Sequence, residues 1–129
     1  MIVLDASAVI ELLLRTPTGE GVAQRIAGEP LAATHLIDVE VAQVMRRYER
    51  ARAVTASRGR QLLEDLVDLD ATRYPHDVLL PRVWQLRANL TAYDAVYVAL
   101  AEALGAPLLT CDGRLARATG HRARVERFS

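Results

Sequence analysis

The amino-acid sequence predicts an α/β protein with a central, mostly parallel β-sheet that is flanked by helices on both faces. Short apolar segments alternate with longer segments of helical periodicity along the whole chain. The apolar segments are continuous rather than alternating, which is typical of strands buried on both faces of a parallel sheet. The chain has 129 residues and contains no internal repeat, low-complexity tract or linker. We therefore expect residues 1–129 to form a single domain.

The first half of the chain is expected to hold two strands and three helices. Residues 2–4 are a short apolar run that ends at Asp5, and apolar side chains at helical spacing between Ile37 and Tyr48 predict a long helix. Gly and Pro at positions 28–30 indicate a turn. The expected elements are a strand at 2–4, a helix at 6–15 that is broken by Pro17 and Gly19, a second helix that runs to about 27, a strand at 31–33 and a helix at about 36–51.

The second half is expected to continue the alternation of helices and strands. The segment after Asp94 is apolar almost throughout, which predicts a central, buried helix that ends at Gly105. Pro107 then introduces a buried strand that ends near Asp112. The expected elements are a helix at 55–69, a short strand at 71–74, helices at 78–89 and 92–104, a strand at 108–110, a short helix and an edge strand at 123–128.

The composition excludes several classes of protein and site. All 16 basic residues are Arg and balance 16 acidic residues, so the whole chain carries no basic excess. One Cys allows no internal disulfide and no Cys-based zinc site, and the three His residues have no ligand spacing. The N-terminus has no cationic start, and no segment approaches the roughly 20 apolar residues of a membrane span. We expect a cytoplasmic protein.

The charges are nevertheless unevenly distributed along the chain. Residues 46–60 contain six Arg and one acid, and residues 113–129 contain five Arg and one acid. Residues 62–77, in contrast, contain five acids and one Arg. The two basic segments could face a polyanion, or each run could simply be a solvated helix face.

Two acidic residues follow predicted strands, at the point where each strand ends. Asp5 and Asp112 each stand between a strand and a helix. Either residue alone is explained equally well as a helix N-cap. Since the carboxyl ends of parallel strands share one edge of the sheet, where ligands bind, the pair is expected to direct two carboxylates to the same place.

Two further acids, on predicted helices, are candidates for the same site. Asp94 lies in the first turn of the apolar helix, next to its buried body, although Thr91-x-x-Asp94 also resembles a capping box. Glu40 lies one position from an apolar helical stripe and has no basic residue three or four positions later. A solvated helix surface also explains Glu40.

If the four carboxylates converge, their charges need a counterion. Two like charges about 4 Å apart repel by about 4 kcal/mol at an effective dielectric constant of 20. Carboxylates without Cys or His favour Mg²⁺ or Mn²⁺, and such an ion can polarise a phosphate and activate a water molecule. The pattern therefore predicts hydrolysis of a phosphodiester bond, with Asp5, Glu40, Asp94 and Asp112 as the catalytic and metal-binding residues.

The sequence resembles the PIN-domain nucleases over nearly its whole length. Residues 2–8 (IVLDASA) resemble the opening of that family, and three further motifs follow in the family's order. These motifs are DVEV at 38–41, LTAYDAVYVALA at 90–101 and LLTCDGRLA at 108–116. The likeness is greatest to the VapC-like toxins of type II toxin–antitoxin modules.

The resemblance implies a three-layer fold and an Mg²⁺- or Mn²⁺-dependent endoribonuclease that cuts RNA by attack of water. It places Asp5, Glu40, Asp94 and Asp112 on the family's acidic positions, and Ser7 and Thr110 on positions that support them. It implies a VapB-like antitoxin and a second copy of the chain as partners, with no membrane. One departure is Gln43, where the family often has Asn, which concerns the surroundings of the site rather than its ligands.

Four other side chains receive individual interpretations. Arg114 follows Asp112 closely and is the basic residue best placed to bind an RNA phosphate. Trp84 and Tyr97 lie at apolar positions of helices, which favours core packing over base stacking. Cys111 is interpreted as a small residue that faces the core.

Three alternative functions have distinct requirements. A signalling receiver domain needs a second acid after the first strand and a Lys near the end, and this chain has no Lys. A phosphatase with an aspartate nucleophile usually has an acid two residues after that aspartate, where Ser7 stands. A PIN-like protein that binds RNA or antitoxin without cutting remains an alternative that an assay has to decide.

Overall fold

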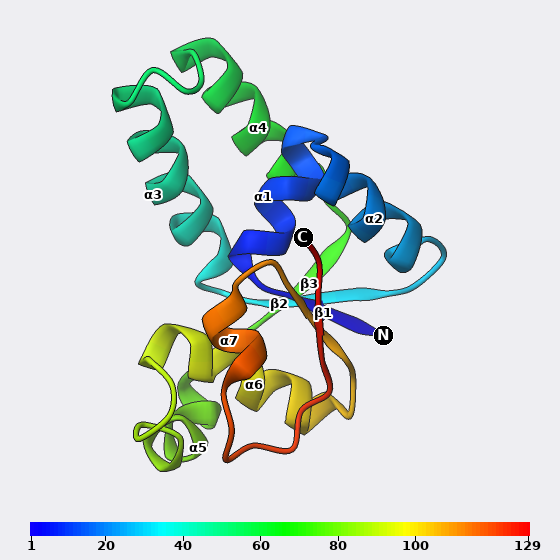
Figure 1. The fold of residues 1–129 in the computed structure, drawn as a ribbon, viewed down its shortest axis with the longest axis vertical. Coiled ribbons are helices and arrows are strands. Elements are labelled where there is room, and N and C mark those ends of the chain that lie inside the picture. The colour runs from blue at the N-terminus through cyan, green and yellow to red at the C-terminus, as the bar shows by residue number, and fades with distance from the viewer.

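Five short strands form one sheet in which every neighbouring pair is parallel, as the computed structural model of residues 1–129 shows (Figure 1). The strands are β1 (Ile2–Leu4), β2 (Leu31–Thr34), β3 (Ala71–Tyr74), β4 (Leu108–Thr110) and β5 (Val125–Arg127). Their spatial order is β3-β2-β1-β4-β5, so β1 lies at the centre. Val3 is aligned with Ala32 of β2 on one side and with Leu108 of β4 on the other. The predicted parallel α/β fold is confirmed.

Helices cover both faces of this sheet (Figure 1). The group α1–α4 packs together on one face, and α5–α7 lie on the other, where α6 contacts β1, β2 and β4. The helices are α1 (Ala6–Leu14), α2 (Pro17–Ile26), α3 (Ile37–Arg50), α4 (Ala56–Asp68), α5 (Leu80–Gln85), α6 (Ala92–Leu104) and α7 (Gly113–Arg117), with a 3₁₀ turn, η1, at Asp77–Leu79. None of the helices combines the length and the apolar character that crossing a bilayer requires.

The core is one cluster of 30 buried apolar residues, centred on β1, β4 and α6. All residues of β1 and β4 are buried, and so are the seven consecutive residues 95–101 of α6. A helix that is apolar all round has no solvent face, which explains why α6 is enclosed between the sheet and α5. Gly105 ends α6 in the left-handed conformation, with φ of 61°, as its position after the apolar run predicted.

The predicted helix over residues 78–89 is only partly formed. The segment begins with η1, α5 ends at Gln85, and residues 86–89 form turns. The amide of Leu86 is shared by the carbonyls of Arg82 and Val83, and the amide of Arg87 reaches the carbonyl of Trp84 only three residues back. The last turn is therefore tightened, which ends the helix earlier than its side-chain pattern indicated.

Core packing was the wrong prediction for Trp84, whose side chain is 67% exposed. The guanidinium carbon of Arg87 lies 4.3 Å from the centre of its ring. Tyr97, in contrast, is buried as expected. Cys111 lies just past β4, half-buried against the core, and burial raises the pKa of its thiol to about 11.

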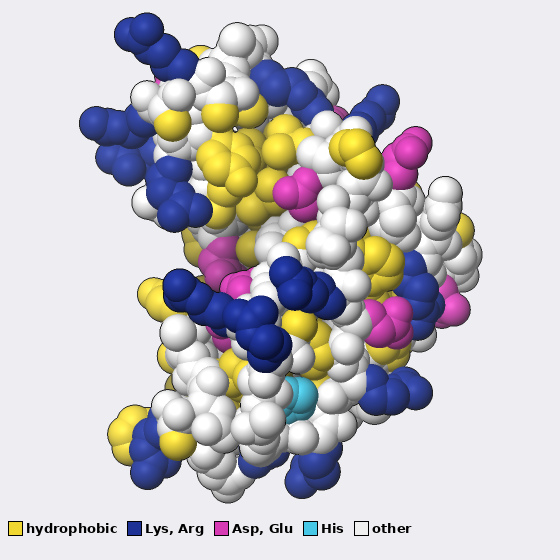
Figure 2. Space-filling view, viewed as in Figure 1, with side chains coloured by type: hydrophobic (Ala, Val, Ile, Leu, Met, Phe, Trp, Pro, Cys, Tyr) yellow, Lys and Arg dark blue, Asp and Glu magenta, His cyan; other side chains and the backbone are white.

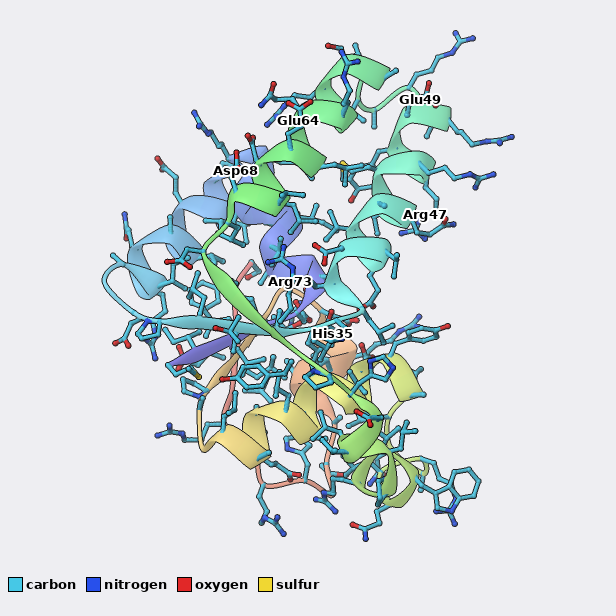
Figure 3. All side chains as sticks on the ribbon, turned by 180° about the vertical axis from the view of Figure 1, so that it is seen from behind. His35, Arg47, Glu49, Glu64, Asp68 and Arg73 are labelled. Atoms are coloured by element: carbon cyan, nitrogen blue, oxygen red, sulfur yellow. The ribbon has the colours of Figure 1, made fainter.

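The charged segments separate in space (Figure 3). Glu64 and Asp68 lie along α4 on the side away from Arg47 of α3. Arg73 of β3 lies between the sheet and these helices, where it donates to both carboxylate oxygens of Asp38 and to the carbonyl of Leu66. This single guanidinium joins α3, α4 and β3, so the one Arg of the acidic segment is paired with an acid outside that segment.

The first helix ends before Pro17, as the sequence suggested, but Gly19 is not part of the break. It lies inside α2, at a point where α1 crosses closely. Pro17 occupies the start of α2, where its missing amide hydrogen costs nothing, and Thr16 caps the helix. A Cβ atom on Gly19 would lie only 1.9 Å from the carbonyl oxygen of Glu11. The contact between α1 and α2 therefore depends on the absence of a side chain at this position.

We predict that Gly19→Ala destabilises the protein, because α1 and α2 would have to move apart to admit the methyl group. Overpacking of this kind costs about 1–3 kcal/mol of the free energy of unfolding, which chemical denaturation measures. Gly21→Ala in the same helix is the matched control, since its Cβ would meet Phe128 at an ordinary 3.5 Å. Alanine favours a helix over glycine by up to about 1 kcal/mol, so a comparable loss in Gly21→Ala would contradict the packing argument.

Candidate active site

Asp5 stands directly after the central strand β1 and is almost completely buried, with 5% of its surface exposed. As the N-cap of α1, its Oδ1 accepts the Ala8 amide at 2.9 Å and the Ser7 hydroxyl at 2.7 Å. Its Oδ2 accepts the Thr110 hydroxyl at 2.5 Å. A carboxylate has about four acceptor positions, so one remains free on Oδ2. Asp5 is thus both an N-cap and a partly free ligand.

The hydroxyls of Ser7 and Thr110 connect Asp5 to the end of β4. Each hydroxyl gives its only proton to Asp5 and accepts a backbone amide in return. Ser7 Oγ accepts the amide of Cys111 at 2.8 Å, and Thr110 Oγ1 accepts the amide of Asp112 at 2.9 Å. Neither hydroxyl has a proton left for chemistry, so both residues hold Asp5 in place.

Asp112 follows β4 as Asp5 follows β1, and it caps α7. Its Oδ1 accepts the amide of Arg114 at 2.8 Å, and its side chain is otherwise half-exposed. The second carboxylate oxygen is free. The strand-end argument from the sequence is therefore right about placement, because β1 and β4 are neighbours with parallel direction.

Asp94 lies in the first turn of α6, at the same edge. Thr91 caps the helix by accepting the Asp94 amide at 3.2 Å, but no backbone amide donates to the Asp94 carboxylate in return. The capping box that the sequence suggested is therefore only half-formed. The Asp94 carboxylate therefore remains available to bind a ligand at the N-terminal end of the buried helix α6.

Glu40, in the first turn of α3, is oriented from the core. The hydroxyl of Tyr97, a residue of α6 with 1% of its surface exposed, donates to Glu40 Oε1 at 2.6 Å. Burial, followed by the charge of Glu40, raises the pKa of Tyr97 far above its usual range, so Tyr97 remains a donor. Glu40 is thus held in place and is not a freely solvated helix residue.

The acids of this edge lie close enough to repel one another. Burial raises the pKa of Asp5, Glu40 and Asp94. The charge of Asp94 adds to the rise for Asp5 and for Glu40, and the charge of Asp112 adds to the rise for Asp94. None of the four forms an ion pair, whereas Asp38, Glu102 and Glu126 each bind an Arg at 2.8 Å. The structure therefore gathers four carboxylates and pairs none of them directly with a basic side chain.

This donor set suits a hard divalent cation. No three acidic, His or Cys side chains are already arranged closely enough to hold an ion by themselves. Mg²⁺ keeps several water ligands and needs few protein oxygens, so an open, unpaired carboxylate group is compatible with it. The free oxygens of Asp5, Glu40, Asp94 and Asp112 are the candidates.

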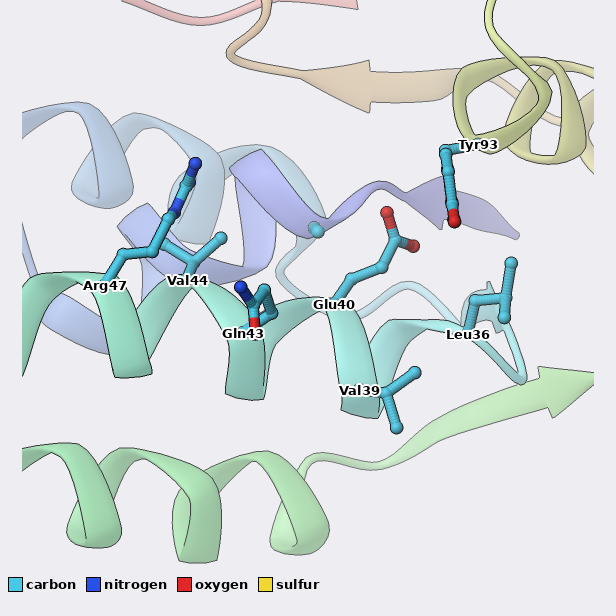
Figure 4. A pocket seen from close by; sticks show the side chains of 8 residues that line it. Leu36, Val39, Glu40, Gln43, Val44, Arg47 and Tyr93 are labelled. Atoms are coloured by element: carbon cyan, nitrogen blue, oxygen red, sulfur yellow. The ribbon is translucent and has the colours of Figure 1, made fainter.

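Basic side chains and a groove border the acids. The charge of Arg114 offsets part of the rise in the pKa of Asp94, which places this exposed guanidinium near the site. A groove of about 420 Å³ opens beside Glu40, between α3 and the start of α6, and Arg47 lies at its far end. Figure 4 shows Tyr93 facing α3 across this groove, and in Figure 2 acidic side chains lie in a hollow with basic side chains above and below it.

Two residues of the site region were missed or misjudged from the sequence. Tyr97 was interpreted only as a core residue, because its apolar spacing gives no sign that its hydroxyl reaches Glu40. Tyr93 was not singled out, although its position next to Asp94 was a usable signal. Asp5 is a poor candidate for a phosphatase nucleophile, because both its oxygens accept hydrogen bonds and its surface is almost closed.

Comparisons with known proteins agree with this architecture. Residues 2–120 match the family model of the PIN domain. The chain is 44% identical over 126 residues to Ribonuclease VapC12 of Mycobacterium tuberculosis, which covers 98% of each chain. It is 48% identical over 115 residues to VapC ribonuclease Mb0985 of Mycobacterium bovis, covering 89% of this chain and 88% of that one. A solved structure of VapBC2 from Rickettsia felis, bound to a promoter DNA fragment, shares the fold, with a TM-score of 0.72 and 13% identity over the full length of both chains.

We predict that the metal-free protein loses stability as the pH rises from about 4 to 7. The pKa values of Asp5, Glu40 and Asp94 are higher in the folded chain than their usual 3.8–4.5, so the folded state binds these protons more tightly than the unfolded state. Raising the pH through this window therefore favours unfolding. Glu102 and Glu126, whose pKa values are lowered by Arg, act in the opposite direction but only below 4.5.

Asp94→Asn should reduce this loss, because it removes one of the repelling charges. At pH 7 in EDTA, the melting temperature should rise by roughly 3–5 °C, which corresponds to about 1 kcal/mol in a domain of this size. Asp68→Asn, on the exposed side of α4, is the control. An equal rise in both variants, measured by thermal unfolding across the pH range, would count against repulsion at the acidic edge.

Proposed function

The chain belongs to the PIN-domain family, and from this membership we propose that it is the toxin of a type II toxin–antitoxin module that hydrolyses RNA with Mg²⁺ or Mn²⁺. The observation that carries the proposal is the group of four unpaired carboxylates at the carboxyl edge of the sheet. The relatives named VapC ribonucleases, which match most of the chain at 44–48% identity, support the same activity.

The residues of this chain have separable roles in the proposed reaction. Asp5, Glu40, Asp94 and Asp112 would hold the ion, which supplies charge stabilisation for the phosphate and lowers the pKa of the attacking water. Ser7 and Thr110 fix Asp5, and Tyr97 fixes Glu40. Water adds to phosphorus, the bond to the leaving oxygen breaks, and that oxygen takes up a proton. Arg114 binds a phosphate of the RNA beside the reacting one.

The proposed partners are a VapB-like antitoxin and a second copy of the chain. A structural relative is a VapBC assembly, which supports an antitoxin as a partner. The groove that adjoins the acidic edge is lined by apolar side chains such as Leu36 and Val39, so it offers a partner an apolar surface to bind. A protein that binds RNA or antitoxin without cutting is the second candidate, and the cleavage assay separates the two.

We predict that Asp94→Asn abolishes RNA cleavage while the fold survives. The variant should lower the rate by more than about a hundredfold, because loss of a ligand weakens both metal binding and charge stabilisation. Purified wild-type protein should cleave structured RNA with Mg²⁺ or Mn²⁺ and stop in EDTA, and the variant should no longer inhibit growth. Cleavage by Asp94→Asn at the wild-type rate would show that the metal-site assignment is wrong.

We predict that Arg114→Ala weakens RNA binding and leaves metal affinity nearly unchanged. Loss of one phosphate contact should make the dependence of log K on log salt shallower by roughly 0.7 for single-stranded RNA. Binding is measured across a salt series, and Mn²⁺ affinity by calorimetry. Arg87→Ala, which removes an arginine that stacks on Trp84, is the control. An equal loss of Mn²⁺ affinity in Arg114→Ala would refute its role as a phosphate contact.

A further inference from the structure

The groove beside Glu40 has a feature that hydrolysis by itself does not require. It runs along α3 from Leu36, past Glu40 at the acidic edge, to Arg47 at the other end. Arg47 lies seven positions after Glu40 in the helix, which corresponds to about 10 Å along the helix axis. A chain bound at the acidic edge has room here for about one further nucleotide unit before it reaches Arg47. The groove is therefore continuous with the proposed site of cleavage.

The walls of the groove present one exposed aromatic ring. Tyr93 is 63% exposed although it directly precedes Asp94, and its hydroxyl makes no hydrogen bond. In Figure 4 it stands across the groove from α3, near Leu36 and Glu40. Val39 and Val44 complete an apolar surface on the α3 side. A flat, apolar ligand that enters the groove can lie against the ring and remove both surfaces from water.

Apart from Glu40, which accepts from Tyr97, the polar side chains of the groove are few and have no hydrogen-bond partner. The side-chain amide of Gln43 is exposed and has no hydrogen-bond partner in the protein, so it offers a donor and an acceptor together. Such an amide suits the edge of a nucleobase, which also carries donors and acceptors side by side. Arg47, the only basic residue of the lining, suits the next phosphate.

We propose that this groove binds the nucleobase next to the scissile phosphate, with Tyr93 stacked on its face, Gln43 bonded to its edge and Arg47 on the following phosphate. The inference rests on the proposed ribonuclease function and deepens it. Sequence-specific recognition of RNA generally uses unstacked bases held on aromatic side chains. Continuity with the acidic edge and the unpaired guanidinium of Arg47 favour RNA over a peptide as the occupant, because the proposed reaction brings a phosphodiester chain to this edge and Arg47 can bind its next phosphate.

The test is a double-mutant cycle that combines the Tyr93→Ala substitution in the protein with removal of one nucleobase from the RNA. The probe is a hairpin RNA whose cleavage position has been mapped with the wild-type protein, together with the same RNA made abasic at each nucleotide that flanks the cut. Tyr93→Ala should raise KM for the intact RNA by about 5–150-fold with a smaller change in kcat, as expected for loss of one stacked base. One abasic RNA should show a similar rise with wild-type protein. The two changes together should cost no more than either alone.

Three further arms make the outcome decisive. Tyr93→Phe, which keeps the ring face, should restore most of the binding that Tyr93→Ala loses. Trp84→Ala, which removes another exposed ring outside the groove, should leave KM unchanged. The affinity of each variant for the antitoxin is measured in parallel.

The results that overturn the inference differ from those that overturn the function. If the wild-type protein cleaves RNA and Tyr93→Ala has the same KM, or its effect adds fully to that of every abasic RNA, the groove does not hold the base. A loss of antitoxin affinity alone would assign the groove to a peptide. If the wild-type protein cleaves no RNA under any metal condition, the proposed function fails and the inference with it.

Discussion

The carboxylate of Asp5 is fixed by hydroxyls from α1 and from the end of β4, and the acidic edge depends on this arrangement. Ser7 belongs to the helix that Asp5 caps, whereas Thr110 lies more than a hundred residues away at the end of β4. The same two hydroxyls accept the amides of Cys111 and Asp112. The network therefore joins the ends of two neighbouring strands and positions the second acid, Asp112, relative to the first.

The core and the acidic edge share the helix α6. Its apolar body is enclosed by the sheet and α5, whereas its first turn lies at the surface and so presents Asp94. One turn further into the core, Tyr97 fills space in the hydrophobic cluster and also donates to Glu40. A helix that is anchored so completely gives two acids on different elements a fixed relationship, which is what a site for a small, geometrically demanding ion requires.

The carboxylates of this edge lack the ion pairs that several carboxylates elsewhere in the fold make. Elsewhere three carboxylates form ion pairs with arginines, as in the contact of Asp38 with Arg73 that joins α3, α4 and β3, and these pairs serve the architecture. At the edge, burial and mutual repulsion raise the pKa of three carboxyl groups, none of which forms an ion pair, and the charge of Arg114 offsets only part of the rise for Asp94. Such an arrangement lowers the stability of the metal-free chain and is typical of a functional site.

The sequence by itself determined the parallel α/β class, most of the elements and the positions of Asp5 and Asp112, because strand-end placement follows from local periodicity and from the direction of parallel strands. It did not determine the early end of α5 or the exposure of Trp84, where hydrogen bonds and a stacking contact within four residues override the side-chain pattern, nor the role of Gly19, which depends on the crossing of α1. The tertiary structure alone decided that Thr91 leaves the Asp94 carboxylate free, that Tyr97 orients Glu40, and that Tyr93 faces a groove. The physical reason is that hydrogen bonds and close contacts between residues tens of positions apart leave no periodic trace in the sequence.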